Sequence, residues 1–524
     1  MALRRLDFDI VALGRIAAQA SGGSKCTDMV VIGEGTFNRI FRLSFDTADD
    51  IIARIPFPNS GPRSLLTRSE VATMEFVRTR LGAHVPRVLA WNACPDNDVG
   101  CEYIIMEECA GDVLAKRLDI ASDSSRYIFD ITEILSQLSA IPFSQYGSIY
   151  FTEDVEPSLR SIPLYAEGEK SDVCSERFRI GPSVDRRFYR GERARMDIDR
   201  GPWKDIHSYI EAAVDCEIKW IEAHSNSPSA QKQLGARHTA AQHISLLNQW
   251  LSLAPAVLPS PEYCQPTLSH PDLHAANIFV NDESMSVTGI IDWQGACVRP
   301  LFETPIPQFV DVDTSNLIYA KLTTDDLPVF PDNFDAMSDA QKLEALAEMT
   351  QIASKACLLG LVSRTHPALY ASLRLLQMEY LRRTIYYSSY SWADGLPLLE
   401  QTLMSLTAAY GGYIPVNPES PICPLSFSEA DVRRHETEFK DIIHAEEWLD
   451  SHATTLLKTY GFTVYKDGSV DEEAFEEARK KADECFVDIL TTIARERGKE
   501  SAERFRHHWP LREGKFVHSM ESCV

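Results

Sequence analysis

Three polar side chains in residues 269–277 have types and spacing that could support catalysis. The segment reads Ser-His-Pro-Asp-Leu-His-Ala-Ala-Asn, so His270 stands two residues before Asp272 and Asn277 stands five residues after it. A carboxylate can orient an attacking hydroxyl and accept its proton, and an amide oxygen five residues on can hold a metal ion on phosphate groups. This spacing therefore favours phosphoryl transfer. The alternative interpretation is a polar loop in which Asn277 caps a turn.

A second carboxylate follows at a suitable place in the chain. Asp292 lies 20 residues after Asp272, directly behind the apolar pair Ile290-Ile291. The apolar run predicts a buried strand, so Asp292 would stand at a strand end and could hold a metal ion from the side opposite to Asn277. The alternative is an aspartate that simply ends a strand. The order His270, Asp272, Asn277 and Asp292 is a much more specific indication of phosphoryl transfer than His-x-Asp alone.

Glycines near the N-terminus could bring backbone N–H groups close to phosphates. Gly33 and Gly35 fall in a turn between two predicted strands, and glycine permits such a close approach. Asn38 replaces the third glycine of G-x-G-x-x-G, so the motif alone is weak and a simple hairpin turn is the alternative. A dinucleotide-binding fold is not indicated because a strand, not a helix, follows. A Walker A loop is not indicated because Gly-Lys-Ser/Thr is missing.

The strand-like run Ile-Ala-Arg-Ile resembles the kinase strand V-A-I-K, with Arg54 in the place of the lysine, so Arg54 is the cation expected to pair with nucleotide phosphates. It would also pair with a glutamate on the following helix, for which Glu70 is the first choice and Glu75 the second. Arginine is always charged and offers a planar fork of donors, so it suits both partners. The alternative is a surface salt bridge between Arg54 and a nearby acid.

The strand-like run that begins at Tyr103 leads into a connector. Met106 would form a wall of a pocket, and the backbone of Glu107 to Cys109 would bond the edge of a nucleotide base. The alternative is an ordinary strand end.

The elements that must position these residues follow from the apolar periodicity. The pattern predicts helices over 6–20 and 69–81, strands over 28–32, 38–45, 51–55, 85–91 and 103–106, and a hairpin of 278–280 with 287–291. We expect the chain to be mostly helical up to about residue 264, except in the arginine-rich stretch 177–200, and again after 340, with a long helix over 472–506. The predicted divisions are an N-terminal helix (1–24), a nucleotide-binding lobe (25–109), a catalytic lobe (110–325, with an arginine-rich insertion at 147–205) and a helical extension (326–524).

Composition excludes several classes of protein. Hydrophobic residues make up 44% and charged residues 24% of the 524 residues, which are globular proportions. The net charge of −24 makes nucleic acid an unsuitable partner. No apolar run is long enough for a membrane helix, and 12 cysteines without a CxxC pair favour reduced thiols inside the cell.

Residues 177–200 hold eight arginines and four acids. They could form part of an acceptor site for an anionic substrate, or a solvated loop with local salt bridges.

With these motifs in place, the sequence resembles the aminoglycoside phosphotransferase and choline kinase branch of the protein-kinase-like fold. His274 is typical of that branch, where protein kinases usually carry lysine, and no A-P-E segment follows Asp292. More closely, it is similar to fungal phosphotransferase-family proteins related to altered inheritance of mitochondria protein 9. The stretches that carry this resemblance are GEGTFNR (33–39), ARIP (53–56), SEVATM (69–74), GPW (201–203), HPDLHAANIFV (270–280), IIDWQ (290–294) and 300–302.

The resemblance implies an α+β, bilobal protein-kinase-like fold. A small antiparallel sheet with one helix would form the N-lobe, and a larger, mainly helical C-lobe would carry a helical C-terminal extension. It implies that Asp272 is the catalytic base, that His270 braces the loop, and that Asn277 and Asp292 bind the metal. ATP and Mg²⁺ would be the cofactors, and a hydroxyl group of a small molecule would accept the phosphate.

Other functions stay open on the sequence. A nucleotide-binding pseudokinase or scaffold is suggested by Arg54 in the usual place of lysine and by Asn38 in place of glycine. A protein kinase is less favoured because of His274 and the missing A-P-E segment. We expect no nucleic-acid partner, no membrane span and no obligate protein partner. The expected location is the cytoplasm, with the mitochondrion as the alternative.

Overall fold

The computed structural model describes residues 7–23, 25–35, 37–82, 84–118, 126–311, 329–416 and 422–440, with single helical positions between 477 and 495. The chain forms two compact units. The first comprises Met1–Cys216 with Leu258–Arg382, and the second comprises Glu217–Val257 with Arg383–Val524. The predicted helix 472–506 lies mostly outside the described residues. The division of the sequence into four segments stays a prediction.

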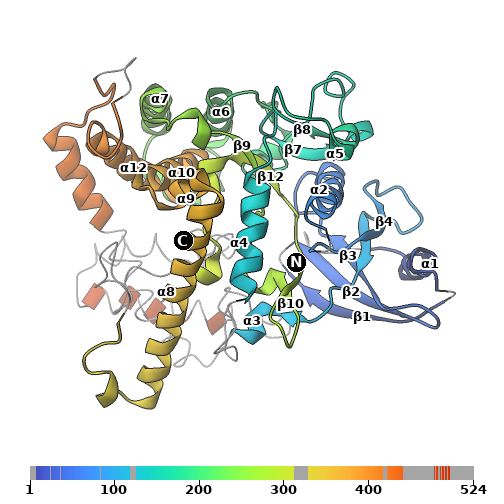
Figure 1. Cartoon of the computed structure of the whole chain (residues 1–524). Coiled ribbons are helices and arrows are strands. Elements are labelled where there is room, and N and C mark those ends of the chain that lie inside the picture. Colours follow the sequence, from blue (N-terminus) through green and yellow to red (C-terminus); the bar gives the residue numbers. More distant parts are fainter. Residues whose placement is uncertain are drawn as a thin grey trace. The chain divides into compact units, whose positions relative to one another are not determined.

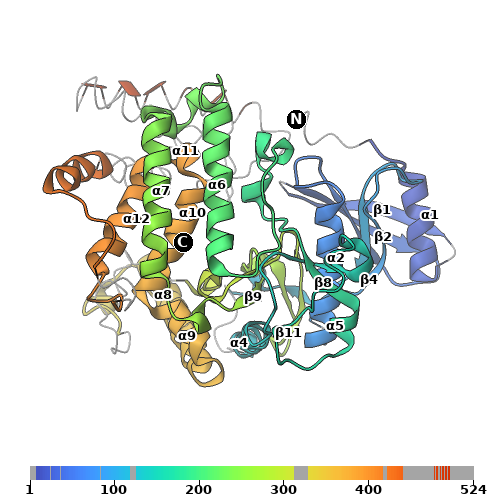
Figure 2. The same cartoon turned by 90° about the horizontal axis from the view of Figure 1, so that it is seen from above.

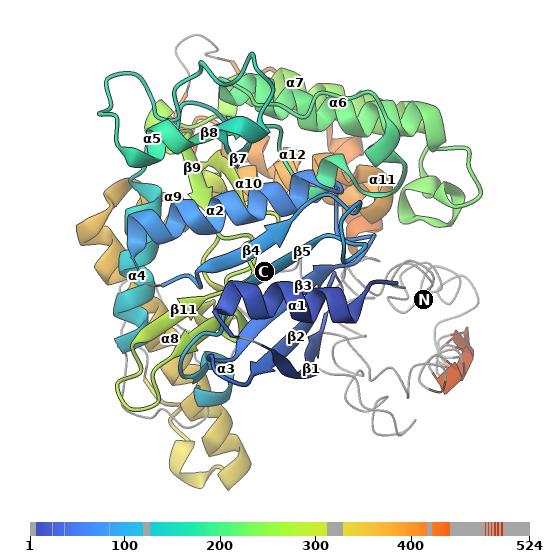
Figure 3. The same ribbon diagram turned by 90° about the vertical axis from the view of Figure 1, so that its right-hand side faces the viewer.

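A five-stranded antiparallel sheet dominates the N-terminal part of the first unit (Figure 1). Its strand order is β1-β2-β3-β5-β4, and its strands are β1 (Cys26–Glu34), β2 (Asn38–Phe45), β3 (Ile51–Pro56), β4 (Val88–Asn92) and β5 (Tyr103–Glu107). Helix α1 (Ile10–Ser21) lies across one face of this sheet (Figure 3). Side chains alternate along strands, so Phe41 and Leu43 of β2 point to that face and pack with Leu13 of α1. The predicted small antiparallel sheet is confirmed.

Helix α2 (Leu65–Leu81) begins four residues before the predicted start at residue 69. Ser64, just before the helix, has a positive φ of 65° and caps nothing with its own side chain. Instead, the buried carboxylate of Glu102 accepts hydrogen bonds from the Ser64 N–H (3.0 Å) and from the Thr67 hydroxyl (2.6 Å). A carboxylate supplied from the loop before β5 therefore caps the first turn of α2, and sequence periodicity could not predict this.

The remainder of the first unit combines helices with short strands. Its elements are β6 (Asp112–Val113), α3 (Leu114–Arg117), α4 (Arg126–Ser139), β7 (Ser148–Phe151), α5 (Val173–Arg177), β8 (Phe178–Gly181), β9 (Pro266–Ser269), β10 (Ile278–Val280), β11 (Val287–Ile290), β12 (Cys297–Pro300), α8 (Asp339–Thr365) and α9 (Pro367–Arg374). The strands pair as three small sheets: β11-β10-β6, β12-β9 and β7-β8. The predicted hairpin of β10 with β11 is confirmed.

The prediction of a mostly helical stretch up to residue 264, from which the arginine-rich residues 177–200 were excepted, is wrong for residues 140–172. Strand β7 lies there and pairs antiparallel with β8, and short 3₁₀ helices at Arg186–Phe188 and Gly191–Arg195 follow β8. Prolines and glycines recur through this stretch, at Pro142, Pro157 and Gly168 among other positions. They prevent long helices, and the short strands between them carry too few residues for a clear period.

Helices alone make up the described part of the second unit (Figure 2). Its elements are α7 (Ala240–Val257), α11 (Ser391–Asp394) and α12 (Leu396–Ala409), and the unit boundaries fall within α6 (Ile206–His224) and α10 (Leu376–Ser389). His243 of α7 is fully buried, with Nε2 2.9 Å from the Gly235 carbonyl oxygen and Nδ1 3.2 Å from the Ser391 hydroxyl. Burial lowers the pKa of His243 to about 4, so its ring is neutral at pH 7.

One helix among the described residues is long and apolar enough to cross a membrane by length and composition alone, namely Gln341–Thr365 within α8. Helices of protein cores pass the same test. Leu358 and Val362 of this helix are fully buried in the core of the first unit, where α8 packs against α4. The expectation of no membrane span stays a prediction.

Candidate active site

His270 joins the two segments that carry the candidate catalytic residues. Its Nδ1 accepts a hydrogen bond from the Asp272 N–H (3.1 Å), so Nε2 carries the proton and donates it to the Ile291 carbonyl oxygen (2.9 Å). The ring is buried and lies 4.6 Å from the Trp293 ring, centroid to centroid. Burial lowers the pKa of His270, which favours the neutral ring that these two bonds require. One side chain thus holds the backbone at Asp272 close to the residue before Asp292.

Asp272 itself is held by a residue to which sequence reasoning gave no role. The His274 Nε2 lies 3.3 Å from the Asp272 Oδ2, and the His274 Nδ1 accepts a hydrogen bond from the Ala276 N–H (3.1 Å). This arrangement places the proton of His274 on the nitrogen that faces the carboxylate. The Asp272 side chain is 37% exposed, so it stays accessible to a substrate hydroxyl. The available signal was the His-x-Asp-x-His spacing.

Asn277 is buried at the end of the same loop. Its Nδ2 donates to the Asp272 carbonyl oxygen (2.9 Å), and its own carbonyl oxygen accepts from the Ile291 N–H (3.0 Å). Because the amide nitrogen is used within the loop, the oxygen Oδ1 is the end of the amide that can bind a cation.

A buried ion-pair cluster links the sheet to the catalytic segments. Arg54 of β3 is 5% exposed and pairs with Glu70 of α2 and with the Asp292 carboxylate, at 2.7 Å from Nη2 to Oδ1. Burial lowers the pKa of Arg54, and the charge of Asp292 opposes that shift. Of the two predicted partners, the structure pairs Glu70 with Arg54, whereas Glu75 faces Arg177 at 3.5 Å.

Asp292 adopts a conformation that is rare for a residue with a side chain. Its φ is +63°, in the left-handed region, directly after β11 and Ile291. Such conformations cost of order 1 kcal/mol or more and persist where neighbouring contacts hold them. The ion pair with Arg54 is one such contact. The side chain remains 41% exposed.

These oxygen donors suit a hard divalent cation. The Asn277 amide oxygen and the partly exposed Asp292 carboxylate belong to adjoining loops, which the Asn277 carbonyl to Ile291 N–H bond joins. Magnesium is bound in proteins by one or two carboxylates together with phosphate oxygens and waters, so this donor set fits it. Among the described residues, no group of three or more His, Cys, Asp or Glu side chains is arranged to hold a metal ion by itself.

The turn between β1 and β2 closes on itself and faces open space. Gly35 donates its N–H to the Asn38 carbonyl oxygen (3.0 Å), and a Cβ placed on Gly35 would meet no atom within 4 Å. Gly33 sits just beyond a register shift in β1. The Asn38 side chain, in place of the third glycine, exchanges two hydrogen bonds with the Gln294 amide (2.9 and 3.3 Å). This clasp joins residues 256 positions apart, and no local sequence signal could reveal it.

The side chains of the connector Glu107 to Cys109, whose backbone was predicted to bond a nucleotide base, contact other parts of the protein. Glu107 pairs with Arg87 at 2.8 Å, and Glu108 pairs with Arg42. The Cys109 sulfur packs where a Cβ of Gly289 would be, and burial raises the pKa of its thiol to about 12. The proposed contacts of the Glu107 to Cys109 backbone with a base stay a prediction.

The sheet face that carries Arg54 also supplies an apolar surface, of which sequence reasoning named Met106 but not Ile40 or Ile52. Ile40 is paired with Arg54, Ile52 precedes Arg54 by two residues on the same face, and Met106 is paired with Ile52. These side chains are buried or half-buried. Only the strand register, not the sequence period alone, places them together.

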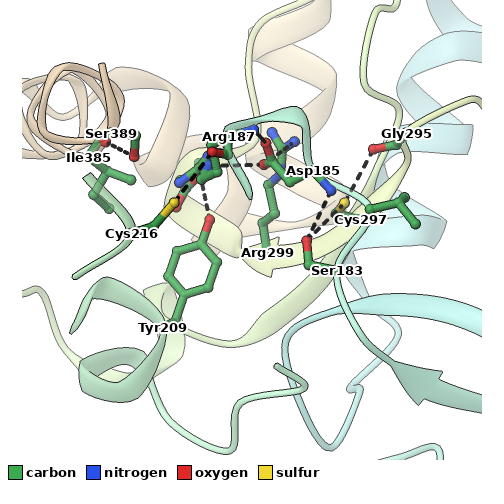
Figure 4. A network of polar contacts seen from close by, with 12 residues as sticks. Ser183, Asp185, Arg187, Tyr209, Cys216, Gly295, Cys297, Arg299, Ile385 and Ser389 are labelled. Carbon is green, nitrogen blue, oxygen red and sulfur yellow. Dashed lines mark hydrogen bonds and ion pairs between the residues drawn. The ribbon is translucent and has the colours of Figure 1, made fainter. Parts of the chain in front are cut away.

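Most arginines of the 177–200 segment serve the fold. Arg187 lies in a buried network with Asp185, Arg299 and Glu303 (Figure 4). Although burial alone would raise it, Arg187 and Arg299 lower the pKa of Asp185 to about 2. Other arginines bond backbone carbonyl oxygens, namely Arg179 (to Arg160, Ser175 and Phe178) and Arg200 (to Phe188, Arg193, Met196 and Ile198). Arg187 is therefore not an accessible anion site. Arg177 forms a local ion pair with Glu75 and Arg195 is exposed, so both interpretations of the segment as a whole stay predictions.

Comparison with known proteins shows the family to which the chain is similar. The model of the phosphotransferase enzyme family (APH) matches residues 28–303, more than half of the chain. A subtelomeric hrmA-associated cluster protein of Aspergillus fumigatus is 29% identical, over 86% of this chain and 91% of its own length. Altered inheritance of mitochondria protein 9 of Candida dubliniensis is 24% identical, over 84% and 76% of the two chains. A solved macrolide 2′-phosphotransferase of Brachybacterium faecium shares 14% identity with a TM-score of 0.31, over 76% and 97% of the two chains.

Proposed function

Because this chain belongs to the phosphotransferase enzyme family, we propose that it transfers the γ-phosphoryl group of ATP to a hydroxyl group of a small molecule. The observation that carries the proposal is the buried Arg54, which pairs both with Glu70 of α2 and with Asp292 beside the catalytic loop. This cluster joins the cation, the helix glutamate and the metal-binding aspartate that phosphoryl transfer requires.

Each residue has a defined task in this proposal. Asp272 orients the acceptor hydroxyl and takes its proton at a carboxylate oxygen, while the His274 N–H holds that carboxylate in place. Asn277 and Asp292 would hold Mg²⁺, which when bound neutralises charge on the phosphate oxygens. Arg54 orients the Asp292 carboxylate, and the open space at Gly35 lets phosphate oxygens approach the backbone of the glycine turn closely. Positioning and electrostatic stabilisation then lower the barrier.

The test is ATP turnover with Mg²⁺ or Mn²⁺, measured for the wild type and for Asp272→Asn against pools of hydroxyl-bearing metabolites. We expect ADP release to rise with at least one pool, and the variant to lose that rise by roughly 100-fold or more. ATP binding without turnover in any pool would instead favour the second candidate, a nucleotide-binding scaffold. That candidate is motivated by arginine at position 54, where kinases use lysine.

We propose that the partners of this chain are small molecules. The net charge of −24 disfavours nucleic acid, and no obligate protein partner is proposed. We propose a cytoplasmic location. The mitochondrion remains the alternative, and it is supported by the name of the Candida dubliniensis relative. Fractionation of cells that express the tagged full chain distinguishes the two.

A further inference from the structure

We propose that Arg186 is a further catalytic residue, which contacts the terminal phosphate of the bound nucleotide. This rests on the proposed function. The guanidinium carbon of Arg186 lies 4.1 Å from the centroid of the Phe37 ring. Phe37 lies two residues after Gly35 and directly before Asn38, whose hydrogen bond to Gln294 brings the turn to the segment of Asp292, the proposed metal ligand beside which the terminal phosphate would lie. A cation from residues 177–200 therefore reaches the turn that would enclose the phosphates.

The two residues beside Arg186 are fixed in the buried network of Figure 4. The Asp185 Oδ2 lies 3.0 Å from the Arg187 Nε and 2.8 Å from the Arg299 Nη2. The Arg187 Nη2 lies 3.6 Å from the Glu303 Oε2, which accepts a hydrogen bond from the Tyr209 hydroxyl (3.2 Å).

This network anchors the 3₁₀ helix Arg186–Phe188 on both sides of Arg186. Asp185 also caps the helix by accepting from the Arg187 N–H at 2.9 Å. Asp185 and Arg187 are 8% and 7% exposed, whereas Arg186 is only half-buried. The buried neighbours hold the backbone from which Arg186 extends, so no backbone ordering is needed when its side chain binds a phosphate.

The charge balance of the site calls for such a cation. Arg54 already faces two carboxylates, Glu70 and Asp292, so these three groups together carry a net negative charge. A nucleotide triphosphate brings several more negative charges, and the proposed Mg²⁺ would offset only part of them, so a further cation near the terminal phosphate is favourable. Arg186 supplies a fork of N–H donors that matches phosphate oxygens.

The position of Arg186 favours the nucleotide phosphate over the acceptor. Its contact is with the turn between β1 and β2, which belongs to the nucleotide-binding sheet. The clasp of Asn38 with Gln294 holds the base of that turn to the segment after Asp292. An arginine fixed against this turn is therefore placed to recognise the third phosphate, the group that distinguishes ATP from ADP.

The experiment compares equilibrium binding of ADP and of the non-hydrolysable analogue AMP-PNP, both with Mg²⁺, to the full-length chain by calorimetry. In Arg186→Gln we expect AMP-PNP affinity to fall by roughly 10- to 100-fold and ADP affinity by less than about twofold. Arg186→Lys, which keeps the charge, should lose less. The matched control is Arg195→Ala, which removes an exposed arginine of the same segment and should change neither affinity.

The outcomes separate this proposal from the proposed function. Equal losses of both nucleotides in Arg186→Gln would mean that Arg186 only supports Phe37, and unchanged affinities would remove any role; either result overturns the proposal. If wild type prefers AMP-PNP through Arg186 but transfers phosphate to no acceptor, the contact stands and the transferase fails. If wild type binds neither nucleotide, both fail.

Discussion

At the scale of single residues, Arg54 is the point where distant parts of the chain meet. Its two carboxylate partners come from α2 and from the loop after β11. A buried ion pair offers little net stability compared with an apolar pair of similar size, but removal of one partner leaves an uncompensated buried charge. The cluster is therefore sensitive to single substitutions and tolerant of paired ones.

This sensitivity gives a stability prediction for Arg54. Arg54→Met should lower the free energy of unfolding by about 3–5 kcal/mol, because Glu70, 3% exposed, loses its counter-ion. The double variant Arg54→Met with Glu70→Leu should recover a large part of that loss. Urea unfolding followed by far-UV circular dichroism measures both.

The control is Arg15→Met, which removes an exposed ion pair with Asp98, whose side chains are 68% and 71% exposed. Its effect should stay within about 1 kcal/mol. If the double variant were as unstable as the single one, the cost would come from lost packing rather than from the buried charge.

The sequence allowed some residue pairs to be predicted and hid others. Glu70 could be ranked above Glu75 because the helix period and the position of Arg54 are local features, and the structure confirms that choice. The clasp of Asn38 with Gln294 could not be predicted, because only the complete fold brings the β1–β2 turn to the segment after Asp292.

At the scale of elements, α2 is held along its length by the segment that contains β7, α5 and β8. Three ion pairs link them: Arg68 with Asp154, Glu75 with Arg177, and Arg80 with Asp172. The Phe76 ring contacts the rings of Phe143 and Phe178, at 5.5 and 5.7 Å between centroids. The insertion therefore supports the helix that carries Glu70. The sequence predicted α2 but not this support, because the strands β7 and β8 are too short to show a period.

The cap that Glu102 provides for α2 predicts that the loss of this carboxylate destabilises the helix. Glu102→Ala should destabilise the chain by about 1–3 kcal/mol, because the Ser64 N–H and the Thr67 hydroxyl lose a charged acceptor. Fraying of the first turn should also loosen Glu70 and weaken ATP binding. Urea unfolding and an ATP titration measure the two effects.

Glu133→Ala, on the exposed face of α4, is the matched control and should change stability by no more than about 0.5 kcal/mol. If Glu102→Ala lowered stability but left ATP affinity intact, the cap would serve the helix without serving the site.

At the scale of the whole molecule, the described part of each compact unit contains a buried histidine whose pKa is lowered by burial. His270 lies in the first unit and His243 in the second. An unfolded histidine binds a proton below about pH 6.5, while the folded, buried ring does so only at lower pH. The unfolded state therefore binds more protons in this window, and both units should lose stability as the pH falls below about 6.5.

If the two units unfold independently, a substitution in one of them should change the pH dependence of that unit alone. For His243, the interval from the model-peptide value of 6.5 to about 4 in the fold corresponds to about 3 kcal/mol, lost between those pH values. His243→Gln should remove most of that pH dependence from the second unit and leave that of the first unit unchanged. Urea unfolding at several pH values, followed by pulsed hydrogen exchange at one fixed pH, measures each unit through peptides of α7 and of α4. If the variant flattened the pH dependence of the α4 peptides as well, the two units would unfold as one.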